Sequence, residues 1–210
     1  MKVICVIGDL VNSRNILDRQ GLQKKLDQAL ASINRTSRGH LISPCTITLG
    51  DEYQAVYQDA DTLFRDFWTV LERLSPERIR FSVGLGSLTT AVNSEQAIGM
   101  DGPAFHVARE AMQSTFKRSG ELFRISQAEG TVAPWIEPAL ALLSHETLQW
   151  RPNRLLVFQR LLSGLDPKAI AQEAGITPTA VYKNIQSGAL DAMRDLLGEM
   201  TRWINQEVKP

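Results

Sequence analysis

The sequence has few cysteines, no excess of charge of either sign and no long apolar run. Only two cysteines, Cys5 and Cys45, occur in 210 residues, so a disulfide framework is excluded, and no Cys–His cluster has the spacing of a zinc site. Both cysteines lie in apolar, strand-like stretches and are expected to be buried. Lysine plus arginine equals aspartate plus glutamate, 23 against 23. Any DNA contact therefore has to come from a local surface and not from net charge.

No apolar segment approaches the roughly 20 residues that a membrane-spanning helix needs. The N-terminus offers one lysine and five apolar residues before Gly8 and Asp9, which is too short for the apolar part of a signal peptide. We therefore expect a cytoplasmic protein without a membrane partner. With 43% hydrophobic and 22% charged residues, the composition is that of an ordinary globular protein.

The first 130 residues alternate between strand-like and helix-like patterns. The apolar run at 3–7 is typical of a strand that is buried on both faces, and apolar residues recur at helical spacing from Asp18 to about Asn34. This alternation predicts an α/β or α+β domain at residues 1–130. Further strands are predicted at 46–57 (a hairpin around Gly50), 79–88 and 122–125, and further helices at 59–74 and 103–116.

The remainder of the chain has only helical patterns. Residues 131–140 contain two prolines and no clear period, and they are interpreted as a linker. Beyond it, Asp166 is expected to cap a helix that begins with a proline, Gly175 suits the left-handed turn that closes this helix, and Thr177 caps the next one. A helix, a glycine turn and a capped helix form a helix-turn-helix. Residues 141–210 are therefore expected to form a small all-α domain.

Residues 166–181 resemble the helix-turn-helix of sigma factors and response regulators, and residues 188–196 resemble the helix that follows it. The resemblance implies that the second helix enters a major groove of DNA, where its exposed side chains meet phosphates and base edges. The alternative is a helical bundle for dimerisation or protein docking. The near-neutral local charge favours this alternative, because DNA affinity depends on phosphate neutralisation. The candidate DNA-binding residues are Thr177, Thr179, Ala180, Tyr182, Lys183 and Gln186.

Carboxylates occur at two positions where a strand meets a turn. Asp9 directly follows the first strand, and Asp51 and Glu52 lie at the tip of the predicted hairpin. If the two strands are neighbours, these side chains meet at one rim of the sheet, where paired carboxylates suit Mg²⁺. The residues from Val11 to Arg14 would add backbone N–H groups and a guanidinium for a polyphosphate. The alternative is that Asp9 is a solvated turn residue.

Three motifs resemble the SatD family of bacterial proteins: GDLVNSR at 8–14, TLGDEYQ at 48–54 and GMDGPAFHVARE at 99–110. They occur in order, and the resemblance spans about residues 1–125. The same motifs are more distantly similar to the catalytic palm of class III nucleotidyl cyclases and diguanylate cyclases. This similarity implies an α+β fold with a ferredoxin-like palm sheet, a homodimer, and metal ligands Asp9 and Asp51 with Glu52 adjacent. It also implies a phosphate-facing turn made of Leu10, Val11, Asn12, Ser13 and Arg14.

The third motif departs from the class III pattern, in which an asparagine and then an arginine follow the glycine on a helix. Alignment on Gly102 places His106 at the asparagine position and Glu110 at the arginine position, with Arg109 one residue early. One residue rotates a helical side chain by about 100 degrees, so Arg109 cannot simply replace that arginine. His106 and Arg109 remain candidates for nucleotide binding. The alternatives are a packed histidine and a solvated arginine.

Three functions are open at this point, and the first is preferred. In the first, a DNA-binding transcriptional regulator binds a nucleoside phosphate with Mg²⁺, or with Mn²⁺ in its place, in its palm-like domain. In the second, a nucleotidyl cyclase or nucleotidyltransferase uses metal ions held by carboxylates. In the third, both domains form a non-catalytic scaffold for oligomerisation. The sequence names neither the nucleotide nor a catalytic residue.

Overall fold

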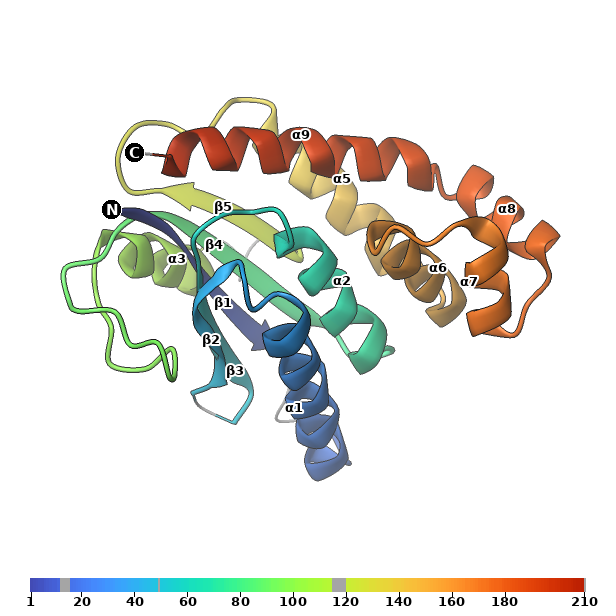
Figure 1. Ribbon diagram of the computed structural model, residues 1–210, viewed down its shortest axis with the longest axis horizontal. Coiled ribbons are helices and arrows are strands. Elements are labelled where there is room, and N and C mark those ends of the chain that lie inside the picture. Colours follow the sequence, from blue (N-terminus) through green and yellow to red (C-terminus); the bar gives the residue numbers. More distant parts are fainter. Residues whose placement is uncertain (12–15, 49, 115–119, 210) are drawn as a thin grey trace.

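In the computed structural model (Figure 1), which describes residues 1–11, 16–48, 50–114 and 120–209, five strands form one sheet in the order β2-β3-β1-β4-β5. The central strand β1 is antiparallel to both β3 and β4, β2 is antiparallel to β3, and β5 is parallel to β4. The elements from β1 to β4 follow the β-α-β-β-α-β order of a ferredoxin-like fold. The predicted α+β fold is confirmed. The strands are β1 (Lys2–Leu10), β2 (Leu41–Ile47), β3 (Glu52–Tyr57), β4 (Ile79–Ser87) and β5 (Phe123–Gln127), and the helices that cover the sheet are α1 (Arg19–Thr36), α2 (Leu63–Leu74) and α3 (Pro103–Ser114).

Different helices cover the two faces of the sheet. The even-numbered apolar residues of β1 pack with α1 and α2 in the main core, whereas Val3 and Cys5 pack against Phe105 of α3. Alternate residues of a strand face opposite sides, so Ile7 and Asp9 lie on the α3 side. The covering of both faces explains the uninterrupted apolar run in β1.

Two glycines of β4 let α3 approach the sheet closely. A Cβ atom on Gly84 would stand 2.0 Å from the carbonyl oxygen of Ala104, and one on Gly86 would stand 3.1 Å from the Ala104 nitrogen. Ser82 of the same strand donates to the carbonyl oxygen of Ala108 at 2.7 Å. Glycine in this strand is therefore a packing requirement that fixes the position of α3.

The helices after β5 pack against the sheet and its helices. Their apolar residues belong to the same hydrophobic cluster as the core of the sheet. Gln159 donates to Thr69 of α2 at 3.0 Å, and Asn205 accepts the N–H of Ala60 at 2.7 Å. Figure 1 shows the last helix running along the molecule and ending near the N-terminus. These helices are α5 (Ile136–Leu148), α6 (Pro152–Leu162), α7 (Pro167–Ala174), α8 (Pro178–Ser187) and α9 (Leu190–Val208).

What the structure supports is one mixed α+β arrangement; a separate all-α domain at 141–210 stays a prediction. The expected linker at 131–140 contains the first residues of α5, which begins at Ile136. Ile136 is fully buried, and Val132 and Ala133 pack against the main core. This segment therefore connects the sheet to the helices through packed residues.

The predicted caps of α7 and α8 are present. Asp166 accepts backbone N–H groups from the first turn of α7 at 2.8 and 3.0 Å, and Thr177 accepts the N–H of Ala180 at 3.1 Å. Gly175 between the helices is left-handed, with φ of 63°. Of the candidate DNA-binding residues, Ala180 is half-buried and the others are exposed. Contact of this surface with DNA stays a prediction.

Two expectations about the rest of the chain can be compared with the structure. Cys5 and Cys45 are buried free thiols, as predicted, and burial raises the pKa of Cys45 to about 12. Within the described ranges, no helix is long and apolar enough to cross a membrane.

Candidate functional site

Asp9 lies at the end of β1, between two polar partners on the α3 side of the sheet. The strand register places it opposite Glu52 of β3 and opposite Arg80 of β4. The Arg80 guanidinium donates from Nη2 to Oδ2 of Asp9 at 2.6 Å, and the two side chains are 21% and 23% exposed. Arg80 was not among the residues that the sequence pointed to.

The carboxylates predicted to meet at this rim do influence one another. Burial raises the pKa of Asp9, the hydrogen bond and charge of Arg80 lower it, and the negative charges of Asp51 and Glu52 raise it, so that it lies above its ordinary value. The carbonyl oxygen of Asp51 accepts the N–H of Leu10 at 3.0 Å, which ties the hairpin tip to the end of β1. The rim thus carries negative charge that a divalent cation would neutralise.

A compact set of three metal ligands occurs elsewhere. In the part of the chain that the structure describes, the only three His, Cys, Asp or Glu side chains whose ligand atoms lie within 4.8 Å of one another are His40, Asp59 and Asp61. This group lies at the opposite end of β3 from the rim. His40 Nδ1 is 2.7 Å from an oxygen of Asp59, and Asn205 donates to Asp61 at 2.7 Å. No pattern in the sequence indicates this group, because only strand pairing brings its two loops together.

Glu52 is oriented by its own hairpin. Thr48 Oγ1 and Gln54 Nε2 each donate to Oε1 of Glu52 at 3.0 Å. These three residues line a cavity of about 370 Å³ between the hairpin and α3, and Arg109 of α3 lines the same cavity. Arg109 thus reaches the neighbourhood of the rim despite its offset in the sequence. The metal-ligand role of the three rim carboxylates stays a prediction.

His106 is not one of the described residues that line this cavity. Its Nε2 lies 2.9 Å from Oδ1 of Asp101, and the two side chains are 63% and 57% exposed. A hydrogen bond from the Gly102 backbone and the contact with His106 lower the pKa of Asp101. His106 is therefore neither packed in the core nor directed at Glu52, and its role in nucleotide binding stays a prediction.

The predicted phosphate-facing turn is described in part. Leu10 is buried and Val11 is half-buried, whereas Asn12, Ser13 and Arg14 lie outside the described residues. The N–H of Val11 donates to the carbonyl oxygen of Arg78 at 2.8 Å, which joins the turn to the start of β4.

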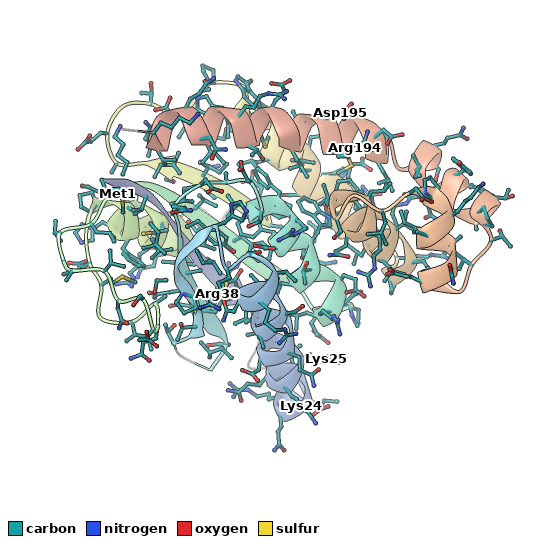
Figure 2. All side chains as sticks on the ribbon, viewed as in Figure 1. Met1, Lys24, Lys25, Arg38, Arg194 and Asp195 are labelled. Carbon is teal, nitrogen blue, oxygen red and sulfur yellow. The ribbon has the colours of Figure 1, made fainter. Side chains whose placement is uncertain are left out.

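A cavity of about 630 Å³ lies beside Val11, on the side of α1. Val11, Lys25 and Arg78 are among its lining residues, and Figure 2 shows Lys25 on α1 next to Lys24. Basic side chains at such a position suit phosphate oxygens. No pattern in the sequence indicates Lys25 or Arg78, because only the fold brings α1 and the start of β4 to the same cavity.

A comparison with protein families identifies the chain. The model of the SatD family matches residues 3–194, which is most of the sequence. The chain belongs to the SatD family. The match extends past the 1–125 expected from the motifs, so the SatD region includes α5 to α8 as well as the sheet. No curated protein matches this SatD-family chain.

Two solved structures are similar to it. One is the catalytic core of a rhodopsin-guanylyl cyclase with converted specificity in complex with ATPαS, at 17% identity and a TM-score of 0.40, covering 54% of this chain and 72% of that one. The other is a bacterial light-regulated adenylyl cyclase, at 14% identity and a TM-score of 0.44, covering 60% of this chain and 43% of that one. Both TM-scores lie below 0.5, which is too low a likeness to assign a function.

Proposed function

We propose that this SatD-family chain binds a nucleoside triphosphate together with Mg²⁺, or with Mn²⁺ in its place, and transfers its nucleotidyl group. The observation that carries the proposal is the meeting of Asp9, Asp51 and Glu52 where β1 ends. Just past that end, on the α1 side, Val11 lines a cavity to which Lys25 and Arg78 also contribute. In such a transfer a hydroxyl oxygen forms a bond to the α-phosphorus and the bond from that phosphorus to the α,β-bridging oxygen breaks. The hydroxyl proton passes to solvent, and pyrophosphate leaves.

Asp9 and Asp51 would hold the metal ion. Arg80 contacts Oδ2 of Asp9, and Oδ1 accepts no hydrogen bond within the described residues. Arg80 also favours the ionised form of Asp9 against the effect of burial, and a carboxylate has to be ionised to bind a cation. When bound, the ion would neutralise the triphosphate and polarise the α-phosphate. Lys25 and Arg78 would contact the outer phosphates.

Thermal unfolding with Mg²⁺ and each common nucleoside triphosphate tests binding. A ligand at a hundredfold excess over its Kd stabilises the folded state by about 2.7 kcal/mol, which corresponds to a rise in Tm of about 5–11 °C. We expect this rise in the wild type and in the control Asp27→Asn, an exposed residue of α1. We expect it to be lost in Asp9→Asn and Asp51→Asn. An equal rise in all four proteins would overturn the site.

Release of pyrophosphate tests the chemistry. We expect release by the wild type and a fall of about 100-fold or more in Asp51→Asn, as when one group that stabilises the transition state is removed. Nucleotide binding without release would overturn the transfer reaction. It would then favour the regulator that the sequence first suggested.

A second function, DNA binding, has support from the shape of α7 and α8. Both helices are capped, a left-handed glycine joins them, and Tyr182, Lys183 and Gln186 are exposed on α8. Fluorescence anisotropy with duplex DNA over a range of salt concentrations tests it. Lys183→Ala is expected to reduce the salt slope by about 1, and Lys24→Ala, on the distant α1, is expected to leave it unchanged. Absence of salt-dependent binding would exclude this function.

A further inference from the structure

The cavity between the β2–β3 hairpin and α3 has the properties of a binding site for a small planar group. Its volume of about 370 Å³ lies within the range of about 300–1,000 Å³ that is usual for small-molecule sites. The hairpin contributes polar side chains, and α3 contributes Arg109. Ile7 and Met112 add apolar surface, against which the faces of a ring can pack.

The hairpin wall of this cavity is a fixed row of acceptors. Oε1 of Glu52 accepts from both Thr48 and Gln54, which holds the carboxylate in one orientation. Oε2 of Glu52 accepts no hydrogen bond within residues 1–11, 16–48, 50–114 and 120–209. Gln54 is only 8% exposed, and its amide N–H is used on Glu52, so its carbonyl oxygen is also left as an acceptor.

The wall formed by α3 contributes hydrogen-bond donors to the cavity. Arg109 is an exposed residue that lines the cavity, and its guanidinium has five N–H groups and no acceptor. A ligand between the two walls must therefore present donors to Glu52 and acceptors to Arg109. This arrangement of hydrogen-bond donors and acceptors distinguishes guanine from adenine.

We propose that the cavity binds the base of the nucleotide and selects guanine, an inference that rests on the proposed function. Guanine carries two adjacent donors, N1–H and the N2 amino group, which match the two remaining acceptors of the hairpin wall, Oε2 of Glu52 and the carbonyl oxygen of Gln54. It also carries two acceptors, O6 and N7, which match a guanidinium. Adenine has an acceptor at N1 and a donor at N6. It would leave Glu52 and Arg109 unpaired, which is costly. In this proposal Glu52 recognises the base and does not hold the metal.

The position of the cavity relative to the rim fits one bound nucleotide. Ile7 and Asp9 lie on the same face of β1, two residues apart, which is about 7 Å along a strand. Glu52, on the neighbouring strand, is the register partner of Asp9. A base beside Ile7 and phosphates at the end of β1 are thus neighbouring places on one strand pair.

Calorimetric titration with GTP, ITP and ATP in the presence of Mg²⁺ tests this assignment. We expect the wild type to bind GTP about tenfold or more tightly than ATP, with ITP, which lacks the N2 amino group, in between. Glu52→Gln can still accept from Thr48 and Gln54 but replaces the free acceptor by a donor, so its preference for GTP should vanish. Glu129→Gln, exposed and outside the cavity, should keep the preference. Arg109→Ala should weaken GTP and leave ATP unchanged.

The outcomes separate this inference from the proposed function. Equal affinity of the wild type for GTP and ATP, with both lost in Asp9→Asn, would overturn guanine selection and keep the nucleotide site. A preference for GTP that survives in both Glu52→Gln and Arg109→Ala would show that another part of the chain recognises the base. Absence of binding of any of the three nucleotides would overturn the proposed function itself.

Discussion

Replacing Gly84 by alanine tests how α3 is held against the sheet. A Cβ atom there would lie 2.0 Å from the Ala104 carbonyl oxygen and 3.0 Å from Cβ of Ala108. Backbone atoms cannot give way as a flexible side chain can, so α3 has to move away from β4. Overpacking of this kind costs about 1–3 kcal/mol. In a chain of 210 residues each kcal/mol lowers Tm by about 2–4 °C, so a fall of about 2–12 °C is expected.

Gly198 offers the matched control. It lies within α9, and an added Cβ atom there would meet nothing within 4 Å. Alanine in a helix is favoured over glycine by about 0.5–1 kcal/mol, so Gly198→Ala is expected to raise Tm by about 1–4 °C. Alanine is therefore expected to lower Tm at Gly84, where an added Cβ atom has no space, and to raise Tm at Gly198, where it reduces the chain entropy lost on folding.

Thermal unfolding followed by circular dichroism measures both variants. Since α3 carries Arg109, Gly84→Ala should also weaken binding of GTP at temperatures where the variant is folded, whereas Gly198→Ala should not. If Gly84→Ala were as stable as the wild type, the close packing of α3 on β4 would be refuted.

Two further predictions concern polar contacts, one of them buried and the other between α9 and the loop before α2. Asp66 is 1% exposed and accepts hydrogen bonds from Ser37 at 2.6 Å and from Tyr57 at 3.2 Å, and burial raises its pKa above the ordinary 3.8. Folding therefore favours the protonated form of Asp66. In urea unfolding, the free energy of unfolding of the wild type should rise relative to that of Asp66→Asn as the pH falls from neutral toward about 4. A difference between the two proteins that is independent of pH would contradict this. Asn205→Ala removes the acceptor of the Ala60 N–H and the donor to Asp61, both at 2.7 Å. It should lower the free energy of unfolding by about 1–3 kcal/mol and speed hydrogen exchange at the Ala60 amide. Unchanged exchange would show that the contact does not hold α9.

The sequence was informative where the pattern is local. The apolar run of β1, the helical spacing of α1 and the capping residues Asp166 and Thr177 each depend on neighbours a few residues away, and each is confirmed. The rim position of Asp9 likewise follows from the residue at which its strand ends. Local physical chemistry is sufficient for such features.

The features that could not be predicted from the sequence depend on strand register and on packing between distant segments. Arg80 pairs with Asp9 because β1 and β4 are antiparallel in one particular register, and a shift by one residue would turn Arg80 to the other face. Lys25 and Arg78 come from two elements that meet only in the fold. An amphipathic helix also shows that it buries a face and not what covers it, so the packing of α6 on α2 was beyond the sequence.

The shared hydrophobic cluster of the sheet and the C-terminal helices has a calorimetric consequence. Two independently folded halves would melt in separate transitions, whereas one core makes each half lose its apolar contacts when the other opens. The chain should then absorb heat in a single peak, with a heat-capacity change of about 2.5–3 kcal/mol/K for its 210 residues. If the single peak is observed, the rim of the sheet and the exposed face of α8 belong to one cooperative unit.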